Sequence, residues 1–191
     1  MAKIQDGKGL GFEAGVDSTN RLLTEAVSLV VREEAVFEGD SFEIGALVTL
    51  TGTAETAVLF VQNNGGRSLI IDRFEFSAAE STGGTSDAML LALYTGATGI
   101  TNSTAGAAVN ANFASALALD ATVSIGNGST SAVSSGTQFG ASYIRFLGQS
   151  IFDGPWALPR GASFALTVTP PASNTSLTFT VRALTHLKRG S

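Results

Sequence analysis

Two runs near the end of the 191-residue chain alternate apolar residues with small or polar ones: FALTVT at 164–169 and LTFTVRA at 177–183. Successive side chains of a β-strand point to opposite faces, so this two-residue period predicts strands with one buried and one polar face. Pro170 and Pro171 cannot extend a central ladder, and we therefore expect the PPASN segment to connect the two strands. This pattern constrains the fold more than any other feature of the chain.

Earlier segments rich in β-branched and aromatic residues also predict strands, at 42–51, 56–62, 68–77, 88–95 and 142–148. The NNGG sequence at 63–66 predicts a tight hairpin, because Asn and Gly tolerate the positive φ that such turns require. About eight strands with few helices predict an all-β fold, an antiparallel β-sandwich or jelly roll.

Two segments of the second half are less regular. The Ala-rich stretch 102–119 is the best helical candidate of the chain, with Ser103 or Thr104 as N-cap, but a loop that feeds a strand is slightly favoured over a helix. The stretch 124–142 is rich in Gly, Ser and Thr and predicts a long loop.

Charge divides the chain near residue 40. Residues 1–43 carry 13 of the 27 charged side chains, whereas Asp120 is the only charged residue between Asp87 and Arg145. The turn-like EGDS sequence at 38–41 marks the change. We therefore expect an N-terminal arm over residues 1–40, with one apolar strand, and a β-sandwich core domain over residues 41–191.

The arm is expected to contact a partner. Its RLLTEAVSLVV segment at 21–31 is too short to be stable as an isolated strand, so it must pair with its own core or with a neighbouring subunit. A Gly-rich lead precedes it and suits a tether that becomes ordered on contact. The residues expected at this interface are Lys3, Ile4, Phe12, Leu22, Leu23, Val27, Leu29 and Val31.

Composition favours burial of surface between chains. Charged residues make up only 14% of the chain, and the mean hydropathy is +0.26. Such a chain either exposes apolar surface or buries it against copies of itself or a partner, and we expect the second. The net charge of −5 argues against nucleic acid as the main partner, and no run of 18 apolar residues predicts a membrane span.

No motif carries the parts of a catalytic or cofactor site. Gly7, Lys8 and Gly9 resemble a phosphate loop but lack the preceding strand, the following helix and the hydroxyl residue. The GDSF sequence at 39–42 resembles a hydrolase serine block, but position 183, three residues before His186, is Ala rather than the expected Asp. One histidine and no cysteine disfavour zinc and iron centres. We expect no enzyme activity, no cofactor and no metal.

Trp156 lies in the FDGPWALPRG segment and is the one clear loop aromatic in the sequence. A tryptophan in such a loop can stack on a sugar, but more often it anchors the loop on the edge of the sandwich. We therefore expect Trp156 to be a loop contact of one of these two kinds.

The order of these segments resembles virion structural proteins of tailed bacteriophages, particularly capsid decoration or cement proteins with a β-sandwich core. The resemblance rests on the KIQDGKGLGFEAGVD arm, on VLFVQNNGGRSLIIDRFEF and on the closing LPRGASFALTVTPPASNTSLTFTVRAL. It implies a homo-oligomer, often a trimer, that binds the major capsid protein of the same particle on the capsid surface. The MAKIQDGKG start lacks the apolar run of a signal peptide, which fits synthesis in the host bacterial cytoplasm.

The alternative hypothesis is a receptor- or glycan-binding module of a phage tail fibre or spike, which is also often a trimeric β-sandwich. Such a module is expected to place aromatic residues in exposed loops. Most phenylalanines of this chain fall in strand patterns, which favours the capsid hypothesis.

Overall fold

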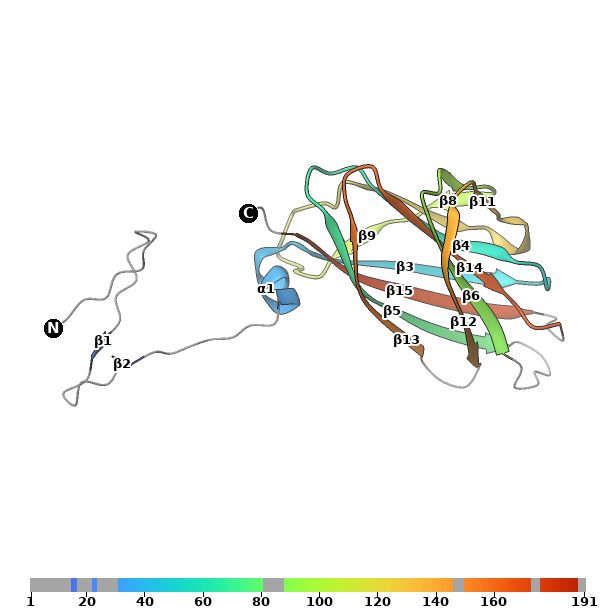
Figure 1. Ribbon diagram of the computed structural model, residues 1–191, viewed down its shortest axis with the longest axis horizontal. Coiled ribbons are helices and arrows are strands. Elements are labelled where there is room, and N and C mark those ends of the chain that lie inside the picture. Colours follow the sequence, from blue (N-terminus) through green and yellow to red (C-terminus); the bar gives the residue numbers. More distant parts are fainter. Residues whose placement is uncertain are drawn as a thin grey trace. The chain divides into compact units, whose positions relative to one another are not determined.

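The computed structural model describes residues 15–16, 22–23, 31–80, 88–145, 150–172 and 176–188. The chain divides into a unit of residues 1–31 and a compact unit of residues 32–191. In the first unit, β1 (Gly15–Val16) pairs antiparallel with β2 (Leu22–Leu23). The second unit contains helix α1 (Val31–Glu38), whose first residue, Val31, belongs to the first unit. It also contains two antiparallel β-sheets that pack face to face (Figure 1).

One sheet has six strands and the other has five. The six-stranded sheet has the order β12 (Thr137–Arg145), β6 (Ala88–Thr95), β14 (Ser163–Thr169), β4 (Thr56–Asn63), β10 (Ala121–Gly126) and β8 (Ser103–Ala105). The five-stranded sheet has the order β13 (Ser150–Leu158), β5 (Leu69–Glu80), β15 (Leu177–Leu187), β3 (Ser41–Leu50) and β9 (Ala108–Asn110). The predicted all-β sandwich is confirmed.

The eight long strands pair in order from the two ends of the sequence toward its middle. The first pairs with the last (β3 with β15), the second with the seventh (β4 with β14), the third with the sixth (β5 with β13) and the fourth with the fifth (β6 with β12). Consecutive long strands therefore lie in opposite sheets, except β6 and β12, which are neighbours in one sheet. This is the topology of a jelly roll.

The segment between β6 and β12 adds strands to one side of the sandwich. Strands β8 and β10 extend the six-stranded sheet beyond β4, and β9 extends the five-stranded sheet beyond β3. A small sheet of β7 (Gly99–Ile100) and β11 (Val133–Ser134), with a 3₁₀ turn at Gly128–Thr130, completes this insertion. The insertion thus covers the side of the sandwich that is formed by β3 in one sheet and β4 in the other.

The core lies between the inner faces of the two sheets. Alternate residues of β3 are buried, as expected for a strand with one solvent-facing side. The largest fully buried side chains include Phe42, Phe60, Phe74 and Phe179. Strand β14 differs from the prediction because nearly all its residues are buried, on both faces. Its outer face is covered because Ala165 joins Phe60 and Ala57 in a second cluster with Ala97 and Ile100 of the insertion.

Residues 102–119 form strands β8 and β9 and a loop and contain no helix, in line with the favoured expectation for this stretch. Here the side chains of Asn110 and Asn112 accept hydrogen bonds from the backbone amides of Asn112 and Ala114. Such local bonds compete with helix formation. Much of the expected loop 124–142 is strand, since β10 extends to Gly126 and β12 begins at Thr137.

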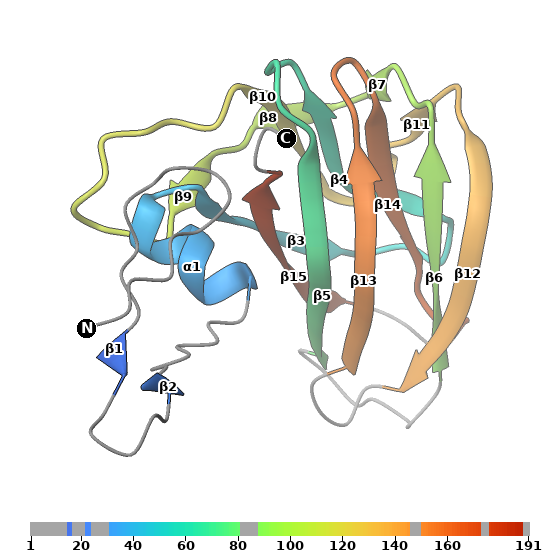
Figure 2. The ribbon, with the colours of Figure 1, turned by 60° about the vertical axis from the view of Figure 1, so that its left-hand side comes forward.

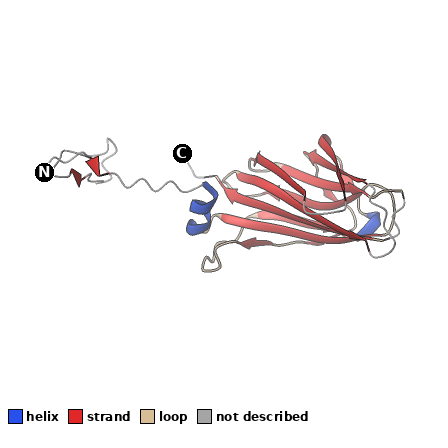
Figure 3. Cartoon of the chain, turned by 90° about the horizontal axis from the view of Figure 1, so that it is seen from below, coloured by secondary structure: helices blue, strands red, loops and turns tan. Residues whose placement is uncertain are grey.

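A short helix occurs where the sequence predicted only the arm. Helix α1 ends at Glu38, and Gly39 follows with φ of +78°. The amide of Gly39 donates to the carbonyl of Val36, and that of Asp40 donates to Ala35, which is the Schellman arrangement. The Asn112 side chain also donates to the Phe37 carbonyl, so the insertion holds the end of the helix. Figure 3 shows this helix at one end of the sandwich.

The NNGG sequence is not a hairpin. Strands β4 and β5 on either side of it lie in different sheets, so residues 64–68 form a corner of the sandwich. Neither Gly65 nor Gly66 has a positive φ. The amides of Asn64 and Gly65 instead donate to the Asp120 carbonyl, and the Asn63 amide donates to the Ala162 carbonyl.

We predict that the buried Asn63 side chain is the main polar support of this corner. It is fully buried, and its Nδ2 donates to the carbonyls of Arg67 and Leu158, both at 2.8 Å. An Asn63→Ala substitution is expected to lower the free energy of unfolding by about 3 kcal/mol in denaturant titration, because it leaves buried carbonyls without donors.

The neighbouring Asn64 provides the matched control. Its side chain makes one exposed hydrogen bond, to Thr122 Oγ1 at 3.0 Å. Asn64→Ala is expected to cost about 0.5 kcal/mol or less. Equal losses for the two variants would contradict the assigned role of Asn63.

Candidate binding surface

The side of the sandwich opposite the insertion is open. Strands β12 and β13 are consecutive in the chain, and each is the last strand of its sheet. Among the described residues, β12 pairs only with β6 and β13 only with β5 (Figure 2). Every second residue of an edge strand directs its amide and carbonyl away from its one partner. Two free backbone edges therefore flank this side of the core.

Two apolar cavities open between these edges. One has a volume of about 410 Å³ and the other about 270 Å³, and both are lined by Leu93, Phe139 and Trp156. None of the described residues that line either cavity is charged. We call the two cavities together the edge groove. Its lining suits an apolar occupant, since an ion would lose its hydration here without gaining a partner.

Trp156 belongs to strand β13 and not to a loop, which corrects the prediction. The register of β13 with β5 shifts between Asp153 and Trp156, so Gly154 and Pro155 form a bulge before the tryptophan. Only glycine fits at 154, because a Cβ there would lie 2.4 Å from the carbonyl oxygen of Ile71. After the bulge the Trp156 ring lies 5.5 Å from the ring of Phe74, between centroids.

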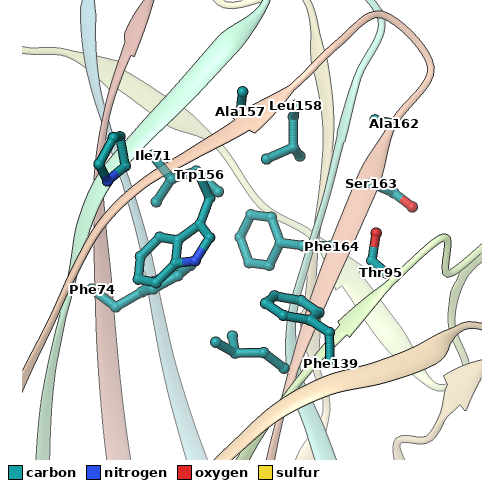
Figure 4. Close-up of a pocket in the computed structure, with 12 residues that line it drawn as sticks. Ile71, Phe74, Thr95, Phe139, Trp156, Ala157, Leu158, Ala162, Ser163 and Phe164 are labelled. Carbon is teal, nitrogen blue, oxygen red and sulfur yellow. The ribbon is translucent and has the colours of Figure 1, made fainter.

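Aromatic rings from both sheets form the floor of the edge groove (Figure 4). The ring centroid of Phe74 lies 5.3 Å from that of Phe164, which comes from the opposite sheet, in an edge-to-face arrangement. Phe76 continues the row and meets Phe152 of β13 at 5.4 Å. Phe139 stands at the rim of the groove and is half exposed. An occupant of the groove would therefore contact the core itself.

A third, more polar cavity lies on the outer face of the six-stranded sheet. It has a volume of about 320 Å³, and its lining includes Glu55, Tyr94 and Thr167 together with the insertion residues Ala132, Val133, Ser135 and Gly136. Glu55 Oε1 accepts hydrogen bonds from Tyr94 Oη at 2.8 Å and from Thr167 Oγ1 at 2.6 Å. Burial, and then the hydrogen bond and negative charge of Glu55, raise the pKa of Tyr94.

The hydrolase-like residues do not form an accessible nucleophile. Ser41 is fully buried, and its Oγ donates to the carbonyl of Thr185 at 3.2 Å. His186 does have an acidic partner, Asp72, with 3.0 Å between Nδ1 and Oδ2. The sequence search missed this carboxylate because it comes from strand β5 and not from position 183. The absence of enzyme activity remains a prediction from the sequence.

An ion pair joins the start of the core to its end. Asp40 accepts two hydrogen bonds from Arg67, at 2.8 and 2.6 Å, and Arg67 also donates to the carbonyls of Leu187 and Lys188. Through Arg67, this bidentate pair links Asp40, two residues after the end of α1, to the end of β15, the last strand of the jelly roll. We interpret this ion pair as a structural contact. The Asp72–His186 pair lies nearby, because His186 precedes Leu187 on β15.

The expected arm interface lies largely outside the described residues. Of its members, Leu22 and Leu23 form β2, where Val16 lies opposite Leu22, and Val31 begins α1. The others are not described: Lys3, Ile4, Phe12, Val27 and Leu29. Over the described part of the chain, no three His, Cys, Asp or Glu side chains are grouped as a metal site would require. No helix in that part is long and apolar enough to cross a membrane.

Comparison with known proteins identifies no relative: no family model, no curated protein and no solved structure matches the chain.

We predict that Glu55 contributes to the raised pKa of Tyr94. The Glu55→Gln substitution removes the negative charge, so the pKa of Tyr94 should fall, while burial keeps it above its ordinary value. The chain has two tyrosines, and a Tyr143→Phe background leaves Tyr94 as the only one for ultraviolet titration of tyrosinate. An unchanged titration curve after Glu55→Gln would show that the carboxylate does not act on this hydroxyl.

Proposed function

We propose that this chain is a non-enzymatic structural protein of a tailed-phage virion, which binds the major capsid protein on the capsid surface and stabilises the shell. The observation that carries the proposal is the open side of the jelly roll, where an uncharged groove and two free strand edges adjoin the core. Surfaces of this kind suit association with another protein surface.

The sequence resemblance supplies the partner in this proposal. A charge-poor jelly roll preceded by a separate N-terminal segment suits attachment through that segment, with the jelly roll making contacts between copies. A protein that binds only the assembled shell stabilises it by mass action, without any reaction. The interface area is then the quantity on which function depends.

We predict that the protein co-sediments with intact capsids of its source particle in a ratio set by the lattice. Removal of residues 1–31 should abolish this attachment and leave the β-sheet circular dichroism unchanged, because the compact unit begins at Arg32. A Phe113→Lys variant, altered at a fully solvent-facing ring outside the arm, should still bind and serves as the control. Full binding by the truncated chain would contradict the role of the arm, and no binding by the intact chain would contradict the proposal.

One observation favours the alternative, a receptor- or glycan-binding module. The cavity at Glu55 combines a carboxylate, the Tyr94 ring and hydroxyl side chains, which are groups that bind polyhydroxylated ligands. Binding of the protein to a glycan array or to host cells, lost on Glu55→Gln, would promote this function over the first. The Trp156 ring no longer supports it as a loop platform, since it packs on Phe74.

A further inference from the structure

The four edges of the two main sheets are not equally protected. Edge strands β8 and β9 have only three residues each, which leaves little backbone to pair. Edge strand β13 carries Asp153 and the Gly154–Pro155 bulge in its middle, and proline has no amide to donate. These are the features by which natural proteins prevent one sheet edge from pairing with another.

Strand β12 is the exception. It has nine residues, TQFGASYIR, with no proline and no charge before its last residue, Arg145. Its one irregularity is a bulge at Phe139, after which residues 140–145 pair with β6 in regular register. Tyr143 is 73% exposed on this regular part and Phe139 is 50% exposed beside it. Among the described residues, β12 is thus a long edge strand that is uncharged up to Arg145 and has no partner on its outer side.

We propose that a second copy of this chain docks on this edge, with its own β12 antiparallel to the first across a two-fold axis. The two six-stranded sheets then form one continuous sheet. This inference goes beyond the proposed function, which calls for an oligomer but names no interface. It also differs from the expected trimer, because a two-fold interface of this kind closes as a dimer.

The charge distribution favours a second copy as the occupant. The whole chain has a net charge of −5, so copies repel at most faces, but residues 137–144 of β12 are neutral. Every copy carries the same free edge at the same concentration, and two identical antiparallel edges are always complementary about a two-fold axis. Pairing also brings the two edge grooves near the interface, where the solvent-exposed area of Phe139 in each copy decreases.

The register follows from symmetry and from side-chain size. A two-fold axis perpendicular to a sheet must place one residue opposite its own copy, because opposite residues share a face. With Ser142 on the axis, the regular parts overlap and Tyr143 of each copy lies opposite Ala141 of the other. A large ring is then matched with a small side chain, and two short serine side chains meet at the centre.

Mass measurement of the full-length protein tests the association. We expect dimers by light scattering that dissociate on dilution, and a Tyr143→Lys substitution should weaken dimerisation at least about tenfold. Phe113→Lys is the matched control, since Phe113 is 94% exposed and lies outside the edge, and it should leave the dimer unchanged. A wild-type monomer at every concentration, a trimer, or a dimer that tolerates Tyr143→Lys would overturn the two-fold β12 interface.

Cysteine cross-linking tests the register and does not depend on the Tyr143 variant. The chain has no cysteine, so Ser142→Cys introduces a single, nearly isosteric thiol. Opposite Cα atoms of an antiparallel pair lie about 4.5–5.5 Å apart, within the range of a disulfide, so oxidation should yield a covalent dimer. In Ala141→Cys the two thiols are offset by two residues, beyond disulfide reach, and little cross-link is expected.

A mixture of Ala141→Cys and Tyr143→Cys chains should cross-link, because these residues lie opposite each other in the proposed register. Cross-linking of Ala141→Cys alone, at the level of Ser142→Cys, would overturn the register. Absence of cross-links in every variant would overturn the interface. The trimer outcome contradicts only the inference, whereas loss of capsid binding contradicts only the proposed function.

Discussion

The packing of Phe74 against rings from both sheets is the interaction on which the two-layer structure depends. Its ring meets Trp156 from the neighbouring strand and Phe164 from the opposite sheet, while Phe76 extends the row to Phe179 and Phe152. Each jelly-roll ladder joins strands distant in the chain, as when β3 pairs with β15. Each sheet has an apolar inner face, and burial of the two faces against each other stabilises the pairing of these distant strands.

The insertion between β6 and β12 makes the jelly roll asymmetric. It lengthens both sheets beyond β3 and β4 and covers Phe60 and Ala165 on the outer face. No comparable segment of the described chain covers β12 and β13. The uncharged β12 therefore has no strand or loop on its outer side within the described part of the fold.

Local patterns predicted most of the long strands, but they missed β13 and the first half of β12, and they did not predict the connections. Strand β6 spans the predicted 88–95, and β3, β4, β14 and β15 lie within a few residues of their predicted ranges. The NNGG sequence failed as a hairpin signal because the jelly roll sends β4 and β5 to different sheets, a non-local constraint. Helix α1 was missed because its end depends on bonds from Gly39 and from Asn112, which lies far along the chain.

The candidate site was less accessible to sequence reasoning. Trp156 was singled out, but its place in a strand follows from a bulge that a glycine at 154 permits against Ile71. Phe139 and Leu93 gave no signal, since they join Trp156 only through the pairing of β12 with β6 and the packing of the sheets. The Glu55–Tyr94–Thr167 network likewise joins residues more than 35 positions apart.

Amide hydrogen exchange along β12, measured on the full chain over a wide range of concentrations, tests the central claim most directly. If the open side of the jelly roll is where copies associate, the outward amides of residues 137–145 exchange quickly at low concentration and become protected as concentration rises. The short edges β8 and β9 should show no such change. Protection of β12 that is the same at every concentration would contradict the account.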